Sequence, residues 1–189
     1  TVFIAVPRVF EKFYDVIAAQ METMGMRRKV FEKALEIGAK VSSYTLYQRK
    51  VPLSLALEFE LADALVFKQI RKAFGGRLRF AVCGGAPLNP AISKFFHNCG
   101  VLILEGYGLT ETTAAIAVNR TNQFVFGTVG LPVDNVKIKI AEDGEILIKS
   151  NKVMIGYNNL PEETAKVLKD GWFYTGDIGE ILPTGEIKI

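Results

Sequence analysis

The chain has 189 residues, of which 49% are apolar, so it can bury one substantial hydrophobic core and is not a disordered protein. Its 23 basic and 20 acidic residues give a net charge of +3, which requires no polyanionic partner such as a nucleic acid. No apolar run approaches the ~20 residues of a membrane span, and the two cysteines lack the spacing of a disulfide framework or zinc site, which favours a reducing, cytoplasmic setting.

Apolar periodicity predicts helices in the first part of the chain. One helical pattern opens at Pro7 and runs to Gly25, and a second covers residues 26–37. Residues 41–60 give a mixed pattern that predicts no single element. A third apolar stripe covers residues 61–74 and ends at a glycine pair, which is typical of a helix C-terminus.

The next stretch predicts a parallel βαβ unit. Residues 77–83 alternate like a strand, and residues 84–88 form a glycine-rich turn. Asn89 is placed to cap a helix over residues 90–98, and a second strand follows over residues 101–104. A strand, a helix and a strand over this length form a parallel crossover.

Two glycine-containing turns leave the carboxyl ends of these two strands, where parallel sheets collect their ligands. The second turn, residues 105–111, holds Tyr107 between two glycines and is followed by Thr110 and Glu111. The glycines allow close backbone approach, and the tyrosine offers a face on which a purine stacks. The hydroxyl and the carboxylate are suitable oxygens for phosphate and Mg²⁺. The sequence therefore predicts a nucleotide pocket here. His97, in the intervening helix, has no paired acid or nucleophile and is expected to be structural.

The remainder of the chain predicts a smaller β-rich lobe with a barrel-like form. Alternation indicates a hairpin over residues 136–148, a short helix fits residues 161–168, and a second hairpin turns at residues 183–185. Asp177 lies between two glycines after an aromatic cluster. One carboxylate can accept hydrogen bonds from two vicinal hydroxyls, which is what a ribose presents. We expect residues 1–119 to form an α/β portion and residues 120–189 the β-rich lobe, both as parts of one larger domain.

Three stretches, residues 84–88, 107–111 and 172–177, resemble in order and spacing the core motifs of the adenylate-forming superfamily. This superfamily includes acyl-CoA synthetases, luciferases and the adenylation domains of peptide synthetases. Residues 6–15 also resemble a segment of long-chain fatty acid CoA ligases. The resemblance implies an α/β fragment of the large acyl-CoA synthetase domain. It also implies an ATP-dependent ligase that joins a fatty acid to CoA through an acyl-adenylate, with ATP, Mg²⁺ and CoA as its small-molecule partners.

The resemblance also implies roles for individual residues. Thr110 and Glu111 are expected to be catalytic, the first through a hydrogen bond to the α-phosphate and the second by binding Mg²⁺. The residues expected to bind ATP or AMP are Gly85, Ala86, Pro87, Glu105, Gly106, Tyr107, Gly108, Thr110 and Asp177. Among these, the loop at 85–87 would line the adenine pocket, Tyr107 would stack on the ring and Asp177 would hold the ribose hydroxyls.

Two parts of the family pattern are not found within these residues. These are the Ser/Thr/Gly-rich phosphate loop and the small C-terminal domain whose lysine assists adenylation. The chain opens without an initiator methionine and ends on a strand pattern in mid-course, so we expect an interior piece of a longer protein. Because the two parts are missing, this piece by itself is expected to have at most weak affinity for AMP or ATP and no turnover. The alternatives are an adenylate-forming domain for an amino acid or a medium-chain acid, and a nucleotide-binding module without catalysis. Chain length of the acid, oligomeric state and peripheral membrane contact of the longer protein are left open.

Overall fold

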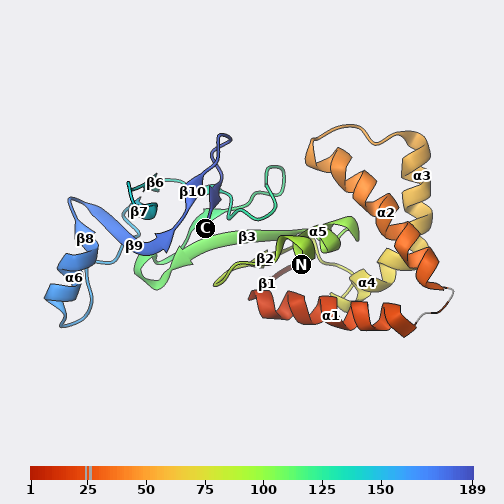
Figure 1. Ribbon diagram of the computed structural model, residues 1–189, viewed down its shortest axis with the longest axis horizontal. Helices are drawn as coiled ribbons and strands as arrows, with labels where there is room; N and C mark the ends of the chain where they lie inside the picture. The colour runs from red at the N-terminus through yellow and green to blue at the C-terminus, as the bar shows by residue number, and fades with distance from the viewer. Residues whose placement is uncertain (24, 26) are drawn as a thin grey trace.

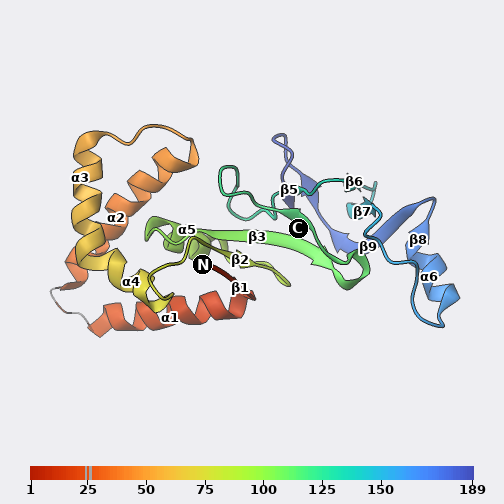
Figure 2. The same ribbon diagram turned by 180° about the vertical axis from the view of Figure 1, so that it is seen from behind.

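The computed structural model describes residues 1–23, 25 and 27–189. Most of the helices cluster at one end of the molecule. A β-rich part, which includes the short helix α6 (Pro161–Val167), lies at the other end, and strand β3 (Ile103–Leu109) runs between them (Figures 1 and 2). The helical elements are α1 (Pro7–Thr23), α2 (Arg27–Leu46), α3 (Leu53–Ala62), the π-helical turn η1 (Asp63–Phe67), α4 (Lys68–Ala73), α5 (Pro90–Asn98), the 3-10 turn η2 (Thr110–Thr112) and α6 (Pro161–Val167). The strands are β1 (Val2–Ala5), β2 (Phe80–Cys83), β3 (Ile103–Leu109), β4 (Ala114–Val118), β5 (Leu131–Pro132), β6 (Lys137–Ile140), β7 (Glu145–Lys149), β8 (Leu168–Lys169), β9 (Trp172–Ile178), β10 (Glu180–Ile181) and β11 (Ile187–Lys188).

The main sheet has the strand order β1-β2-β3-β4-β5 and changes direction at β3. Strands β1, β2 and β3 are parallel, and Ala81 of β2 pairs with Ile103 of β3. From Gly106 onward β3 instead pairs antiparallel with β4, and β4 pairs antiparallel with β5. The predicted βαβ unit is confirmed, and the sheet as a whole is mixed.

The helices agree with the predictions in place and differ in length. Helix α1 begins at Pro7 as predicted, whereas α2 runs to Leu46 and does not stop at residue 37. Gly38 does not end this helix. A Cβ atom at that position would lie 2.3 Å from the carbonyl oxygen of Asn98, so the glycine lets α2 pack against the end of α5. Met24 and Met26, which the predicted helices included, lie outside the described residues.

Residues 41–60, which predicted no element, complete α2 and supply most of α3. Pro52 precedes α3 at its N-cap position, where the missing proline N–H costs no intrahelical bond. Helices α3, η1 and α4 follow one another directly, so the third predicted helix begins earlier than expected, at Leu53. The cap of α5 is confirmed, because the side-chain Oδ1 of Asn89 accepts a hydrogen bond of 2.9 Å from the Ala91 N–H.

The helices and the parallel strands share one hydrophobic core. Phe10 of α1, Phe67 of η1 and Phe96 of α5 are fully buried in it. Phe96 also makes edge-to-face ring contacts with Phe74 and Phe95, at centroid distances of 5.5 and 5.3 Å. These aromatic side chains hold the helices against one face of the sheet.

A second core lies under the β-rich part. Strands β6-β7-β9-β8 form an antiparallel sheet in that order, and β10 pairs with β11. The predicted hairpins and the short helix are confirmed. The expected barrel-like form is not seen in the described residues, since β6 and β8 are the free edges of an open sheet.

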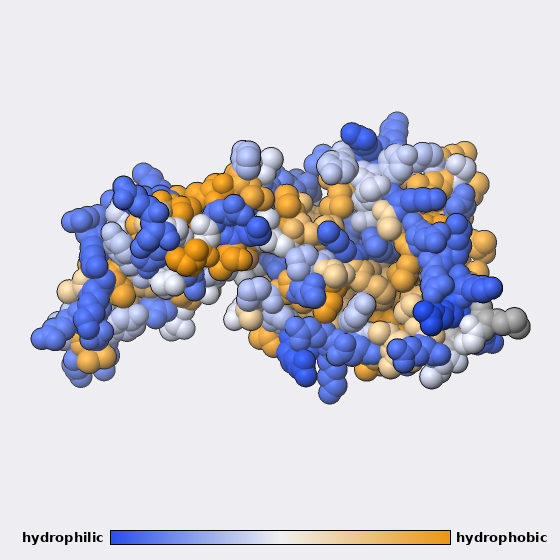
Figure 3. Space-filling model, viewed as in Figure 1, coloured by the Kyte–Doolittle hydropathy of each residue, from blue (hydrophilic) through white to orange (hydrophobic). Residues whose placement is uncertain are grey.

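Apolar side chains remain exposed at the helical end. Leu53, Leu57 and Leu61 lie on α3 at four-residue spacing and are 78%, 65% and 63% exposed. Apolar surface is visible at this edge of the molecule, on the right of Figure 3. Within the residues described, no helix has the length and apolar character to cross a membrane.

His97 makes packing and hydrogen-bond contacts that are typical of a structural residue. Its Nδ1 atom lies 2.6 Å from the Ser42 hydroxyl, and its ring packs edge-to-face against Phe124 and Phe126. Burial lowers the pKa of His97 below its ordinary value. Below the ordinary pKa of about 6.5 the unfolded chain therefore binds a proton that the folded chain does not bind.

Acidification is consequently expected to weaken the fold through His97. The free energy of unfolding should fall as pH drops below about 6.5, by at most ~1.4 kcal/mol per pH unit from this residue. Urea unfolding of the wild-type chain and of His97→Gln between pH 7.5 and 5.5 isolates the effect. The difference in stability between the two proteins should change with pH in favour of the variant as pH falls. A difference that is constant with pH would show that His97 does not couple folding to protons.

Candidate nucleotide site

The central motif lies on a strand and not in a turn. Strand β3 continues through Leu109, so the prediction that residues 105–111 form a turn is wrong for the first five of these residues. The antiparallel pairing with β4, which brings in a partner from later in the chain, extends the strand past the glycines. The turn itself is η2, which carries Thr110 and Glu111.

Gly108 is required by close packing of β4 on β3. A Cβ atom at Gly108 would lie 2.1 Å from the carbonyl oxygen of Ala114, beside the register shift that follows Tyr107. Gly84, at the start of the other motif, would place a Cβ atom 3.4 Å from the carbonyl oxygen of Gly106. The first distance is a severe overlap and the second an ordinary contact.

Gly108→Ala is therefore expected to lower the free energy of unfolding by about 1–3 kcal/mol, because β4 must shift to admit the methyl group. Gly84→Ala is the matched control and should cost less than ~1 kcal/mol. Urea titration of both variants measures the difference. Equal stability of the two variants would mean that the β3–β4 contact is not tight at Gly108.

Tyr107 and Asp177 meet across the junction of the two parts, although 70 positions separate them. The Tyr107 hydroxyl donates a hydrogen bond of 2.5 Å to Oδ2 of Asp177. Burial, together with the neighbouring Asp177 carboxylate, raises the pKa of Tyr107, so the phenol stays protonated and remains a donor. The aromatic ring and the acid predicted to hold a nucleotide therefore lie at one place.

The strand end around Asp177 is fixed by local bonds. The Asp177 N–H donates to the Thr175 hydroxyl at 3.1 Å, and that hydroxyl donates to the carbonyl of Ile146 at 2.8 Å. Gly176 has a φ of +76°, a left-handed conformation that glycine adopts without strain. Its N–H donates to the Glu145 carboxylate at 2.7 Å. These contacts direct the Asp177 side chain toward β3.

The loop at residues 84–88 presents a short exposed ridge beside β3. Gly85, Ala86 and Pro87 are exposed, whereas Leu88 is buried and anchors the loop. The Leu88 N–H donates to the carboxylate of Glu105 at 3.3 Å. Glu105 is only 6% exposed, and burial raises its pKa. Its carboxylate thus holds the neighbouring loop from inside the protein. The nucleotide contact predicted for Glu105 stays a prediction.

Thr110 and Glu111 follow the end of β3 on η2. Thr110 is exposed and Glu111 half-buried. The buried Thr112 fixes the turn, because its hydroxyl accepts from the Leu109 N–H at 3.0 Å. Oε1 of Glu111 accepts a hydrogen bond of 3.0 Å from the Tyr157 hydroxyl. The sequence assigned no role of their own to Thr112 and Thr175, and it gave no indication of Tyr157. The only signal for Tyr157 is a preceding glycine, as at Tyr107, and that pair alone predicts no contact.

The described residues include no cluster of three or more His, Cys, Asp or Glu side chains able to hold a metal ion by themselves. Glu111 offers one carboxylate, with only Oε1 engaged among these residues. Mg²⁺ commonly binds through one or two carboxylates together with substrate phosphates. A single free carboxylate oxygen on Glu111 therefore suits an Mg²⁺ ion whose other ligands are the phosphates of a bound nucleotide.

Two further features are separate from the predicted site residues. Cys83 and Cys99 are free and buried, and burial raises the pKa of each thiol to about 12, which leaves neither as a nucleophile at neutral pH.

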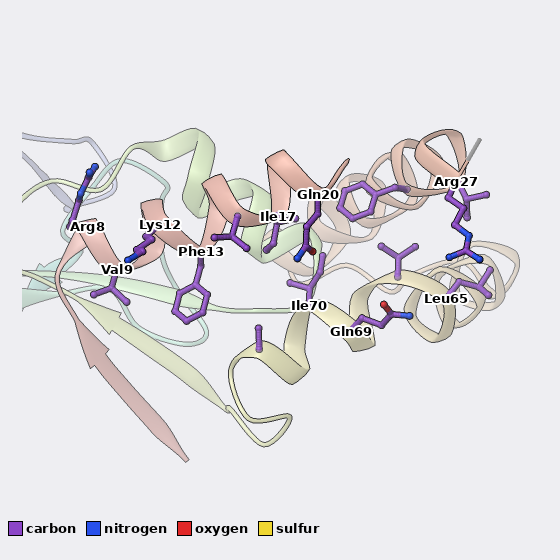
Figure 4. A pocket seen from close by; sticks show the side chains of 15 residues that line it. Arg8, Val9, Lys12, Phe13, Ile17, Gln20, Arg27, Leu65, Gln69 and Ile70 are labelled. Atoms are coloured by element: carbon purple, nitrogen blue, oxygen red, sulfur yellow. The ribbon is translucent and has the colours of Figure 1, made fainter. Parts of the chain in front are cut away.

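A groove of about 1110 Å³ lies between α1, α2, η1 and α4 (Figure 4). Its walls are largely apolar, with Arg8 and Lys12 at one end and Arg27 at the other. No residue of the three core motifs (84–88, 107–111 and 172–177) lines it, whereas four residues of the 6–15 stretch do: Arg8, Val9, Lys12 and Phe13.

Comparison with known proteins supplies the family. Residues 1–158 match the family described as AMP-binding enzyme. The chain belongs to this family. Among curated members, this chain is 38% identical to a long-chain-fatty-acid–CoA ligase, FadD15, of Mycobacterium bovis and 36% identical to long chain acyl-CoA synthetase 1 of Arabidopsis thaliana. Each alignment covers 100% of this chain, which spans 31% of the first protein and 30% of the second.

Solved structures of AMP-binding enzymes share the fold. The N-terminal domain of FACL13 from Mycobacterium tuberculosis superposes with a TM-score of 0.56 at 28% identity, over 67% of this chain and 36% of that one. Apo MatB from Rhodopseudomonas palustris gives a TM-score of 0.57 at 29% identity, over 68% of this chain and 29% of the other. The chain therefore corresponds to part of the large N-terminal domain of an AMP-binding enzyme.

Proposed function

We propose that this chain is the part of an ATP-dependent acid–thiol ligase that binds the adenosine of ATP, and that the acid is a long-chain fatty acid. The observation that carries the proposal is the meeting of Tyr107 and Asp177, with Glu111 at the end of the same strand. The names of the relatives support the choice of acid, since FadD15 and the Arabidopsis protein are long-chain ligases or synthetases.

The reaction has two steps. An oxygen of the fatty acid carboxylate attacks the α-phosphorus of ATP, which forms an acyl-adenylate and releases pyrophosphate. The thiolate sulfur of CoA then attacks the acyl carbon, forms the thioester and releases AMP. Mg²⁺, when bound with ATP, would neutralise phosphate charge.

The residues of this chain bind and orient the nucleotide. The ring of Tyr107 would stack on adenine beside the exposed ridge of Gly85, Ala86 and Pro87. Asp177 would accept hydrogen bonds from the ribose hydroxyls with the oxygen that Tyr107 leaves free. Thr110 would donate to the α-phosphate, and Glu111 would hold the metal with one carboxylate oxygen.

Two measurements test the proposal. Equilibrium dialysis of residues 1–189 with AMP and ATP should show weak binding, and a coupled assay on the same chain should show no acyl-CoA formation. Acyl-CoA formation by residues 1–189 would refute the expected lack of turnover. Absence of any nucleotide binding would refute the assignment of the site.

The acid is tested in the longer protein. Acid-dependent exchange of pyrophosphate into ATP should be fastest with long-chain fatty acids in a panel that includes amino acids, medium-chain acids and benzoate. The competing acids are relevant because a benzoate CoA ligase from Burkholderia xenovorans shares the fold at 26% identity and a TM-score of 0.55. Preference for one of these acids would replace the fatty acid assignment and leave the ligase assignment intact.

We also propose a cytoplasmic protein. The support is chemical, since both thiols are free and buried in the core. Thiol titration of the protein purified without reductant, after denaturation, should recover both cysteines. Recovery of neither would contradict a reducing location.

A further inference from the structure

The backbone at Glu111 is held by hydrogen bonds from the β-rich part of the molecule. The Met154 N–H donates to the backbone carbonyl of Glu111 at 2.7 Å. Two residues along, the Thr113 hydroxyl donates to the carbonyl of Lys152 at 2.9 Å. The segment at residues 152–157 therefore fixes the backbone of η2, although it lies some 40 positions later in the chain (Glu111 to Met154).

The side chain of Glu111 is held by the same segment. The Tyr157 hydroxyl donates to Oε1 of Glu111 at 3.0 Å. In the part of the chain that the structure describes, this is the only hydrogen bond to that carboxylate. One oxygen is thereby restrained while Oε2 remains available to a ligand.

Tyr157 is in turn anchored by α6. Its backbone N–H donates to the Thr164 hydroxyl at 2.9 Å, and that hydroxyl donates to the carbonyl of Leu160 at 2.9 Å. Gly156 permits this approach, because a Cβ atom there would lie 2.9 Å from the methyl carbon of Thr164. A continuous path of contacts thus runs from α6 through Thr164 and Tyr157 to Glu111.

We propose that Tyr157 is a positioning residue that orients the Glu111 carboxylate toward the Mg²⁺ of a bound nucleotide. This inference rests on the proposed function, because Glu111 meets Mg²⁺ only if ATP binds. The physical reason is that a carboxylate ligand held by an outer hydrogen bond has its second oxygen already directed. Removal of such an outer partner typically costs about 10- to 100-fold in metal affinity.

The test uses the affinity of the chain for ATP, measured by equilibrium dialysis with excess Mg²⁺ and again with EDTA. The ratio of the two affinities reports the contribution of the metal. Tyr157→Phe should lower this ratio about tenfold and leave the affinity for metal-free ATP unchanged. Tyr47→Phe is the matched control, since Tyr47 lies outside the three core motifs, is 71% exposed, and its hydroxyl has no hydrogen-bond partner among the described residues.

A double-mutant cycle sharpens the result. Glu111→Gln should remove most of the Mg²⁺ effect, and Tyr157→Phe on that background should cause no further loss. An unchanged ratio in Tyr157→Phe, or a parallel loss of metal-free affinity, would overturn the positioning role while ATP binding by the wild type upholds the proposed function. If the wild-type chain binds no ATP, the proposed function fails, and this inference fails with it.

Discussion

Replacement of Asp177 by asparagine is expected to weaken nucleotide binding by about 10- to 100-fold. Hydrogen bonds to a charged acceptor contribute about 1.5–3 kcal/mol, and asparagine offers a neutral carbonyl in place of the carboxylate. The Tyr107 hydroxyl can still donate to that carbonyl, so the contact between the two parts of the molecule is retained. Equilibrium dialysis with AMP measures the loss, and AMP suffices because the ribose is the group that Asp177 is proposed to hold.

A matched control is available in the turn between β8 and β9. Asp170 is exposed and has a φ of +52°, a conformation that asparagine also tolerates. Asp170→Asn changes charge by the same amount and should leave AMP affinity unchanged. Comparison of AMP with 2′,3′-dideoxy-AMP adds a second check, since the ligand without ribose hydroxyls should not distinguish wild type from Asp177→Asn. Equal AMP affinity of wild type and Asp177→Asn would remove the acid from the site.

Phe96→Ala is expected to lower the free energy of unfolding by about 3–5 kcal/mol. Phe96 is fully buried at the centre of the helical core, and its ring contacts Phe74 and Phe95 edge-to-face. Truncation removes the transfer free energy of the ring and leaves a cavity that the surrounding rings cannot close. Since domains are stable by only about 5–15 kcal/mol, much of the population would unfold under mild urea.

Leu57→Ala provides the comparison for Phe96→Ala. Leu57 also lies on a helix, α3, yet it is 65% exposed. Alanine has the higher helix propensity, so the expected change is within about 0.5 kcal/mol. Far-UV circular dichroism during urea titration compares the two variants. A Phe96→Ala variant as stable as Leu57→Ala would mean that the helical core is not packed as described.

The sequence correctly predicted the features that depend only on residues close together in the chain. Asn89 caps α5 and the hairpin of β6 and β7 turns where the sequence indicates, because a cap and a tight turn depend on neighbouring residues. Two features depend instead on distant partners. Helix α2 passes through Gly38 because α5 packs there, and β3 continues through two glycines because β4 pairs with it.

For the candidate site, likewise, the sequence predicted the residue types and left their arrangement in space undetermined. Tyr107, Glu111 and Asp177 carry the chemistry that a nucleotide requires, so residue type and spacing indicated them. Their convergence follows from tertiary contacts, of which the Tyr107–Asp177 hydrogen bond is the clearest. Tyr157 was missed because its significance is positional, and neither its neighbours nor its periodicity marks it. Roles at individual atoms of a bound nucleotide remain predictions for the binding experiments.

Strand β3 belongs to two pairings of opposite direction, with β2 along its first half and with β4 along its second. Such a strand cannot slip by one residue on one side alone, since each step of slippage would turn every following side chain to the other face. Insertion or deletion of a single residue in β3 should therefore be far more harmful than most substitutions within it. For the same reason, a library that varies this segment should hold its length constant and vary composition alone.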